Sequence, residues 1–254
     1  MPTTTIVRRN SGGFVEIVKT IVYAVVIAVA VRTIAFEPFN IPSASMIPTL
    51  LVGDYLFVSK YSYGYSKYSL PLSPNMFSGR ILGRLPRRGD VAVFKFPSNP
   101  SIDYIKRIVG LPGDRIQMKA GLLYINGEEL GRDYVEDIVA VDEHEIQTSE
   151  KEYSETLPGG RVHLIAKTAD HGGKNDTEEY VVPPDHVFGM GDNRDNSSDS
   201  RFSPMDGGVG FIPVENLVGR AEFVFFSIEQ TAPWWQVWEW PGEIRWSRLM
   251  SGIR

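Results

Sequence analysis

The sequence predicts a mainly β protein with coiled antiparallel sheets, preceded by one apolar helix at the N-terminus. An uncharged apolar run lies at 20–31, and short β-type runs between turn residues fill the rest of the chain. No 3.6-residue apolar period persists long enough to require another major helix. With 254 residues, 43% of them hydrophobic and 22% charged, the chain is long enough for one large core or two small ones.

The composition argues against several functional classes. Cysteine is absent, which excludes disulfide scaffolds, thiol nucleophiles and cysteine-based zinc sites. No two of the 4 histidines are spaced like a metal-binding pair, so we expect neither a metal nor another cofactor. The net charge is −5 and basic residues occur only in short groups, so we expect no nucleic acid partner.

The N-terminal apolar segment is long enough to cross a membrane. Apolar positions continue on both sides of 20–31 and fill the window 14–36. A spanning helix needs about 20 mostly apolar residues, which this window supplies if Lys19 and Arg32 extend towards the lipid headgroups. Three interpretations remain open: a cleaved signal peptide ending at Ala28-Val29-Ala30, an uncleaved signal-anchor, or the buried helix of a soluble protein.

Basic residues near the N-terminus set the orientation that we expect for an exported chain. Arg8, Arg9 and Lys19 hold the N-terminus in the cytoplasm by the positive-inside rule. The body then lies on the far side of the membrane, an oxidising space in which a chain without cysteine is unexceptional.

After Phe36 the sequence consists of short β-type runs separated by Gly, Pro, Asn and Asp. The pair Asn126-Gly127, which follows an apolar run, is a strong signal for a β-hairpin. We expect strands at Tyr55–Val58, Val91–Phe96, Leu122–Ile125, Tyr180–Val182 and Glu222–Ile228.

Two of the polar clusters that follow are candidates for chemistry. Ile41–Leu50 holds Ser43 and Ser45 between two prolines, and in isolation it is equally typical of a capped turn. Asp103–Asp114 places Lys106 on an otherwise apolar strand face, where a lysine must extend to solvent, pair, or lose its proton. A neutral lysine is a competent general base, and an edge-strand lysine in solvent is the alternative.

The third cluster, Gly191–Arg201, follows an apolar run and is expected to be a loop that leaves a strand. It does not fit a calcium loop, because Arg194 stands where an oxygen ligand is needed. The chain has no G-x-S-x-G motif, and the histidine nearest to a candidate serine, His186, precedes Ser197 by a short stretch. A serine–lysine pair therefore matches the residues better than a Ser-His-Asp triad.

Five motifs in order resemble the bacterial type I signal peptidases, or leader peptidases, over about 36–226. They are the N-terminal apolar segment, PSASMIPTL at 42–50, RGDVAVFKFP at 88–97, YIKRIVGLPGD at 104–114 and GDNRDNSSDSR at 191–201. The resemblance implies a retained signal-anchor, since that family works at the membrane surface. It also implies that Ser45 is the nucleophile and Lys106 the general base.

The resemblance assigns further residues to the site. Ser43 would supply a hydroxyl to the oxyanion hole, the backbone N–H of Ser45 the second donor, and Ser197 a hydrogen bond that orients Lys106. The substrate cleft would be lined by Phe39, Ile41, Pro42, Tyr104 and Ile105, and the supporting loop would rest on Asp192, Arg194, Asp199 and Arg201.

The implied function is a membrane-anchored serine endopeptidase that removes signal peptides from exported preproteins. It would cut after a small-x-small motif such as Ala-x-Ala, through an acyl-enzyme. The expected location is the bacterial inner membrane, single-pass and monomeric, with the catalytic domain on the periplasmic or extracytoplasmic side and signal peptides and the lipid bilayer as partners. The alternatives are a specialised Ser-Lys peptidase dedicated to one substrate, a self-cleaving repressor-type domain, and a non-catalytic membrane-tethered binding protein.

With this resemblance the chain divides into five segments. The acidic stretch within 127–184 is interpreted as a solvated surface. The Trp-rich tail either packs on the β core or rests on the bilayer as an interfacial belt. The segments are a cytoplasmic N-terminus at 1–13, the transmembrane signal-anchor at 14–36, a catalytic β core at 37–126 and 185–233, an inserted small β domain at 127–184, and the Trp-rich tail at 234–254.

Overall fold

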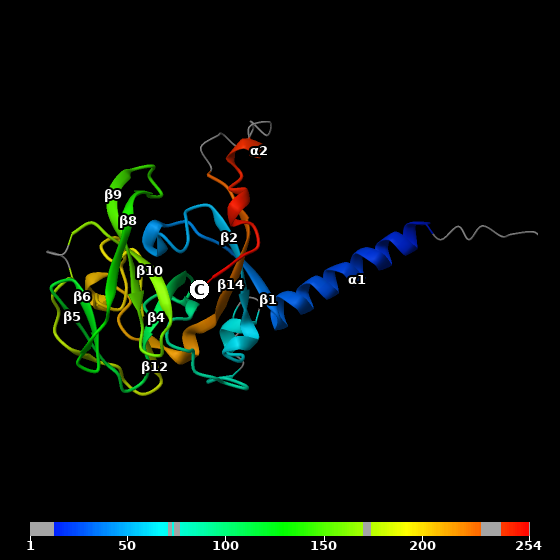
Figure 1. Cartoon of the computed structure of the whole chain (residues 1–254). Coiled ribbons are helices and arrows are strands. Elements are labelled where there is room, and N and C mark those ends of the chain that lie inside the picture. The colour runs from blue at the N-terminus through cyan, green and yellow to red at the C-terminus, as the bar shows by residue number, and fades with distance from the viewer. Residues whose placement is uncertain (1–12, 71–72, 74–76, 170–173, 230–239, 254) are drawn as a thin grey trace, which may run out of the picture.

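Three antiparallel sheets form the body of the protein within the residues that the computed structural model describes, which are 13–70, 73, 77–169, 174–229 and 240–253. The largest has the strand order β1-β2-β14-β3-β4-β12-β13, with β15 paired to β14 (Figure 1). Its strands are β1 Phe36–Asn40, β2 Asp54–Ser59, β3 Val91–Lys95, β4 Asp103–Gly110, β12 His186–Met190, β13 Ile212–Pro213, β14 Leu217–Ser227 and β15 Ser251–Gly252. The prediction of a mainly β, antiparallel fold is confirmed.

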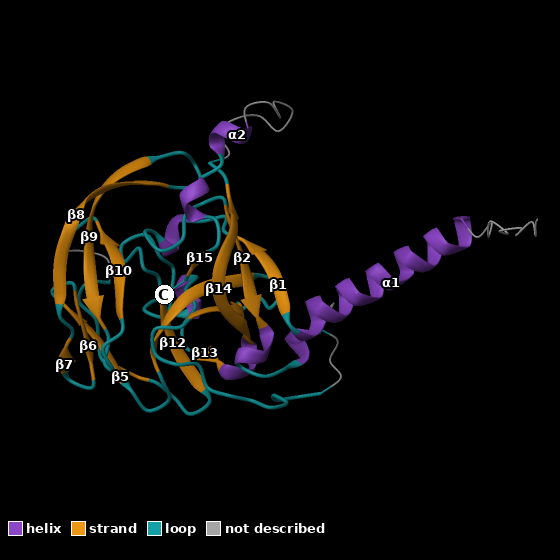
Figure 2. Ribbon diagram, turned by 45° about the vertical axis from the view of Figure 1, so that its right-hand side comes forward, coloured by secondary structure: helices purple, strands orange, loops and turns teal. Residues whose placement is uncertain are grey.

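Two smaller sheets lie beside the large one (Figure 2). The sheet ordered β10-β9-β8 contains β8 Arg132–Val141, β9 Gln147–Thr156 and β10 Val162–Lys167. The sheet ordered β11-β5-β6-β7 contains β5 Arg115–Lys119, β6 Leu122–Ile125, β7 Glu128–Glu129 and β11 Tyr180–Val181. In the second of these, strands from 127–184 pair with β5 and β6, which precede that segment. Because these pairs join residues on both sides of the predicted limit at 127, the sheets do not divide at that point, and the limits of the insertion stay a prediction.

The strands at the centre of the large sheet are apolar along most of their length. β3 lies between β14 and β4, and residues 91–94 of β3 are buried on both faces. β-branched and aromatic side chains suit such a doubly covered strand. Gly219 permits a close approach, because a Cβ there would lie 2.4 Å from the carbonyl oxygen of Ser59 in β2. These central strands form the rigid support on which the polar clusters are placed.

The hairpin expected at Asn126-Gly127 is present. β6 pairs with β7 across this turn, with Ile125 opposite Glu128. Both turn residues have positive φ, 55° for Asn126 and 85° for Gly127, as a two-residue type I′ turn requires.

One long helix, α1 Gly13–Ile34, extends away from the body (Figure 1). None of its residues is buried, although the helix is apolar on all sides and long enough to cross a membrane. The alternative of a buried core helix is therefore wrong, because none of the residues of α1 is buried in the described structure and only its C-terminal end meets the body. The helix ends two residues before the predicted limit at 36, since Phe36 already belongs to β1.

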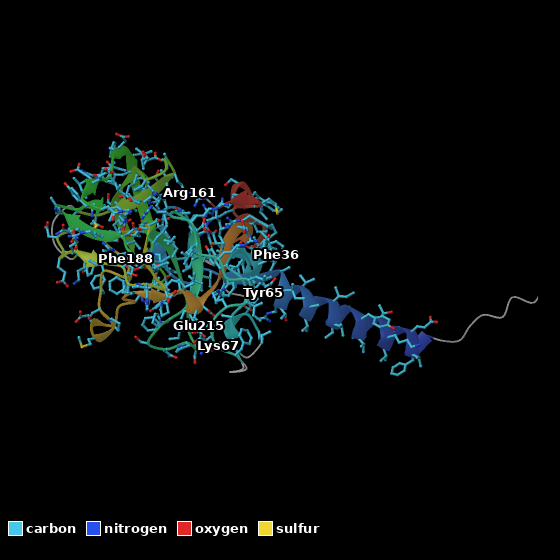
Figure 3. All side chains as sticks on the ribbon, turned by 90° about the horizontal axis from the view of Figure 1, so that it is seen from below. Phe36, Tyr65, Lys67, Arg161, Phe188 and Glu215 are labelled. Carbon is cyan, nitrogen blue, oxygen red and sulfur yellow. The ribbon has the colours of Figure 1, made fainter. Side chains whose placement is uncertain are left out.

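Polar contacts fix the end of α1 to the body. The Tyr65 hydroxyl donates a hydrogen bond to the carbonyl oxygen of Ile34 at 2.7 Å, and Tyr65 lies with Phe36 at the base of the helix (Figure 3). Glu37 of β1 pairs with Arg32 of α1 and with the buried Lys60, both at 2.8 Å. The direction in which α1 leaves the body is therefore set by side chains on both sides of the junction.

The described part of the C-terminal tail packs on the large sheet. The short helix α2 Trp240–Glu243 precedes a 3₁₀ turn at Trp246–Arg248 and then β15. Arg248 forms an ion pair with the buried Asp54. Trp246 is exposed, whereas Trp234, Trp235 and Trp238 lie outside the described residues, so the predicted interfacial belt stays a prediction.

Candidate active site

Ser45 lies on a short turn that leaves the end of β1. The 3₁₀ turn Ala44–Met46 buries the side chains of Ala44 and Met46 and leaves Ser45 partly accessible. Because the residues on either side of Ser45 are held in the core, the backbone of Ser45 is held in place. The Ser43 hydroxyl lies 3.5 Å from the Ser45 hydroxyl.

Lys106 of β4 reaches the same point from the opposite wall. Its Nζ is hydrogen-bonded to Ser45 Oγ at 2.8 Å and donates to the carbonyl oxygen of Ile105 at 2.9 Å. The residue is only 2% exposed. Burial lowers the pKa of Lys106 to about 8, against the opposing charges of Asp199 and Asp192. About a tenth of this amine is therefore neutral at pH 7 and half of it near pH 8, far more than for a lysine in water, next to a hydroxyl that it can deprotonate.

The loop 191–201 supports the site through buried ion pairs. Each of its four predicted supporting residues, all at most 2% exposed, is held by an opposite charge. Burial alone would raise the carboxyl pKa values of Asp192 and Asp199, but the partner guanidinium groups hold them below their usual range. The pairs are Arg107–Asp192, Arg194–Glu155 and Arg201–Asp199.

The same loop contacts the backbone of the nucleophile candidate. The Asn193 N–H donates to the carbonyl oxygen of Ser45 at 3.2 Å. Gly191 is required here, because a Cβ at this position would lie 2.5 Å from that oxygen and 2.2 Å from Ser197 Oγ. Ser197 is buried, and its Oγ has no hydrogen-bond partner in the described part of the chain. The expected hydrogen bond from Ser197 to Lys106 is thus not formed in this structure, although the hydroxyl lies at the site.

A cleft of about 330 Å³ leads to Ser45 and Lys106 between the end of β1 and the start of β4. All five residues expected to line the substrate cleft contribute to its wall, which is mainly apolar. These are Phe39, Ile41, Pro42, Tyr104 and Ile105. Sequence reasoning missed four further wall residues, Asn40, Val93, Ile102 and Asp103, each of which neighbours or faces a predicted one.

Sequence reasoning also missed a contact from the β8–β9 hairpin. The carboxylate of Glu143, at the tip of this hairpin, accepts a hydrogen bond from the N–H of Ala44 at 3.2 Å. Below the tip, Ile138 and Ala140 pack in one cluster with Ala44 and Ile47. The hairpin therefore braces the turn that carries Ser45. The contacting residues are too far apart in the chain for a sequence pattern to show.

Arg107 is a second residue that the sequence reasoning passed over. It follows Lys106 and points to the other face of β4, where it binds both carboxylate oxygens of Asp192, at 2.8 and 2.7 Å. The signal in the sequence was an arginine between Ile105 and Val109 on one face of the strand, because a charge among apolar side chains requires a partner.

The sequence comparison decides the family. Residues 14–226 match the family model described as signal peptidase, peptidase S26. The chain belongs to this signal peptidase family. As a member, it is a serine endopeptidase that removes signal peptides from preproteins.

Relatives named signal peptidase I match most of the chain. Signal peptidase I of Rickettsia typhi is 41% identical over 221 residues, which is 84% of this chain and 80% of the relative. The Rickettsia massiliae enzyme is 41% identical over 222 residues, 84% of this chain and 79% of the relative. A solved signal peptidase I from Enterococcus faecalis is 26% identical and covers 54% of this chain and 97% of its own, with a TM-score of 0.31.

Replacing Arg194 in this signal peptidase tests the buried ion pairs of the loop. Arg194→Ala leaves Glu155 buried without its cation, so we expect the free energy of unfolding to fall by about 3–5 kcal/mol. Arg115→Ala is the matched control, because its pair with Glu179 is exposed and is expected to contribute about 0–1 kcal/mol. Urea denaturation of the detergent-solubilised protein measures both, and equal losses would contradict the structural role of Arg194.

Replacing Glu143 tests the hairpin brace. Glu143→Ala removes the acceptor for the Ala44 N–H, so kcat is expected to fall about three- to tenfold, the effect of one hydrogen bond, with KM unchanged. Glu143→Gln retains an acceptor oxygen and should restore most of the rate. Glu145→Ala removes a charge from the same turn without touching Ala44. If it lowers kcat as much as Glu143→Ala does, the hydrogen bond has no role.

Proposed function

We propose that this signal peptidase cleaves its substrates with Ser45 as nucleophile and Lys106 as general base. The observation that carries the proposal is the 2.8 Å contact between Ser45 Oγ and a buried amine whose pKa is lowered to about 8. Serine is a weak nucleophile by itself and needs an adjacent base, and here Lys106 is the titratable group in hydrogen-bond contact with Ser45 Oγ.

The reaction begins when neutral Lys106 accepts the Ser45 hydroxyl proton and Ser45 Oγ attacks the scissile carbonyl carbon. The Ser43 hydroxyl and the Ser45 N–H are proposed to donate to the oxyanion, and the 3.5 Å distance between the Ser43 and Ser45 hydroxyls supports the first of these roles. The C–N bond then breaks as protonated Lys106 gives its proton to the leaving amine, which leaves an ester on Ser45. Lys106 then takes a proton from water, and the resulting hydroxide adds to the ester carbonyl. The C–Oγ bond breaks, Lys106 returns the proton to Ser45 Oγ, and the new carboxylate of the signal peptide leaves.

Ser197 is proposed to orient Lys106. Its hydroxyl is buried, lacks a partner among the described residues, and lies against Gly191 next to Ser45. An unsatisfied buried hydroxyl at this point is suited to accept a hydrogen bond from the amine once substrate enters. Such a contact would restrict a flexible side chain to one rotamer.

The cleft favours a peptide with small side chains near the cut. Bulky wall residues such as Phe39 and Tyr104 leave little depth beside Ser45, which suits a small-x-small motif such as Ala-x-Ala. Residues 103–106 of β4 pair with β3 on one side only, because β12 joins β4 from Arg107 onward. An extended peptide can add to the free edge by main-chain hydrogen bonds.

The membrane arrangement follows from α1. We propose that α1 is a retained signal-anchor in the bacterial inner membrane, spanning once, with the body on the extracytoplasmic side and the lipid bilayer as a partner. Its exposed, apolar surface and the basic residues before it support this orientation. We propose a monomer, since the site is assembled from one chain. A set of preproteins, rather than one dedicated substrate, is the expected range.

Variants of the dyad test the mechanism. Ser45→Ala and Lys106→Ala should each reduce preprotein cleavage in detergent to background while the protein stays folded. Ser43→Ala should lower kcat about 10²- to 10³-fold, the effect of losing one oxyanion donor. Gel-based cleavage of a preprotein with an Ala-x-Ala site measures all three. Cleavage by Ser45→Ala at the wild-type rate would show that another residue is the nucleophile.

The pH profile tests the base. Because only the neutral amine of Lys106 accepts a proton, kcat/KM should rise with pH and reach half its plateau near pH 8, the pKa of about 8. Below this midpoint the expected slope is about tenfold per pH unit. A profile that is flat across this range would exclude Lys106 as the base.

A further inference from the structure

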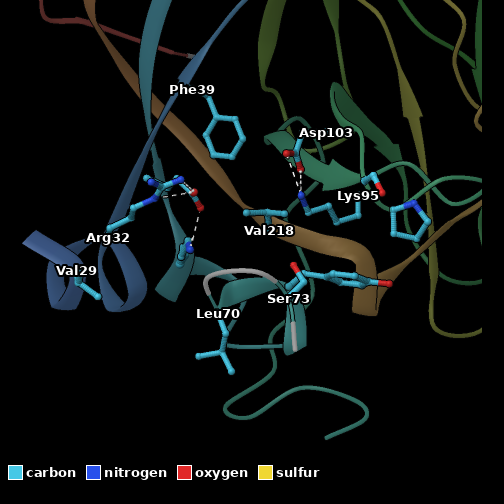
Figure 4. A pocket seen from close by; sticks show the side chains of 13 residues that line it. Val29, Arg32, Phe39, Leu70, Ser73, Lys95, Asp103 and Val218 are labelled. Atoms are coloured by element: carbon cyan, nitrogen blue, oxygen red, sulfur yellow. Dashed lines mark hydrogen bonds and ion pairs between the residues drawn. The ribbon is translucent and has the colours of Figure 1, made fainter. Parts of the chain in front are cut away.

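A second cavity adjoins the catalytic cleft at the end farther from Ser45. Its volume is about 560 Å³, larger than the cleft itself, and Phe39 and Asp103 line both (Figure 4). Val29 and Arg32 of α1 form part of its wall, so it lies where the apolar helix joins the body. The two cavities therefore adjoin at Phe39 and Asp103, and together they extend from Ser45 to the base of α1.

The walls of this second cavity carry charges that are already paired. On one side Glu37 holds Arg32 and Lys60, and on the other Lys95 holds Asp103 at 2.9 Å (Figure 4). Apolar side chains lie between the two groups, among them Leu70 and Val218. The wall thus has three cations and two carboxylates. It offers polar surface with an excess of one positive charge.

The path has the length of a short peptide. From Lys106 back to Asp103 is three residues of strand, about 10 Å at about 3.3 Å per residue. A peptide that pairs with this edge, with its scissile carbonyl at Ser45, therefore enters the second cavity at about the fourth residue from the cut.

The direction of the peptide follows from the position of α1. A signal peptide carries its apolar region before the cleavage site, and this region must stay in the membrane. The second cavity lies at the end of the helix that has the length and apolar surface of a membrane span, whereas the mature chain has to leave in the other direction. Residues before the cut thus face the second cavity.

We propose that the second cavity binds the polar residues of the signal peptide about four to six positions before the cut, and that it disfavours basic residues there. This inference rests on the function proposed above. The charged groups of the wall can form hydrogen bonds with polar side chains and with the main chain of the peptide. A basic residue of the peptide is repelled by the surplus positive charge, because both carboxylates among the described lining residues are already paired.

The test compares two substrates of the full-length enzyme in detergent micelles. The long peptide contains six residues before the cut, and the short one begins at the third residue and fills the catalytic cleft alone. Leu70→Trp narrows the cavity from one wall and Ser101→Trp from another, while Leu85→Trp changes an exposed residue outside it. The ratio of kcat/KM for long over short peptide should fall about tenfold in the two cavity variants and stay unchanged in Leu85→Trp.

A charge exchange tests the preference. Lysine in place of glutamine at the fifth position before the cut should lower kcat/KM of the wild type several-fold. Lys95→Gln removes the surplus charge from the wall, so it should reduce this penalty. Equal penalties in wild type and Lys95→Gln would overturn the charge preference.

The outcomes separate the inference from the proposed function. An unchanged long-to-short ratio in both tryptophan variants overturns the inference, while wild-type cleavage after Ala-x-Ala still supports the function. A wild type that cuts neither peptide overturns both. If the variants lose activity on both peptides in phosphatidylethanolamine–phosphatidylglycerol vesicles but not in detergent, a lipid headgroup occupies the cavity and the inference is wrong. Cleavage of the short peptide serves as the check that each variant is folded.

Discussion

Lys106 is withdrawn from water beside Ser45, and its affinity for a proton depends on two carboxylates buried nearby. Asp192 and Asp199 both favour the protonated amine, which would leave the proposed base without a free electron pair. Each is held in a buried ion pair with an arginine, and this limits the negative field at the amine. The ion pairs of the loop 191–201 therefore allow Lys106 to lose its proton although two carboxylates lie nearby.

The mainly β fold could be predicted because strands and turns are encoded by residues that are adjacent in the sequence, as the hairpin at Asn126-Gly127 shows. The residues alone favoured a serine–lysine pair over a histidine triad, but only the resemblance singled out Ser45 and Lys106, since nothing near either residue shows that they meet. The contact of Glu143 with Ala44 could not be predicted either, because a carboxylate in an acidic segment is usually a solvated surface charge. Burial, which lowers the pKa of Lys106, is a property of the assembled sheets.

The junction between α1 and the body relates the site to the end of the helix. Arg32, Glu37 and Lys60 form one continuous set of ion pairs, and Tyr65 binds the last residue of α1 through its hydroxyl. The cleft opens beside this junction. Under the proposed function, selection of a cleavage site would have two parts: the fit of small side chains in the cleft, and their distance from the end of α1.

The order of strands has a consequence for the time at which the enzyme becomes active. β14 lies between β2 and β3, although it is made more than a hundred residues after both. Until residues 217–227 are available, those two strands lack their shared neighbour, and Ser45 also waits for the backbone of Asn193. A nascent chain therefore contains Ser45 long before it can complete the candidate site. The site is thus completed only after most of the body has been made.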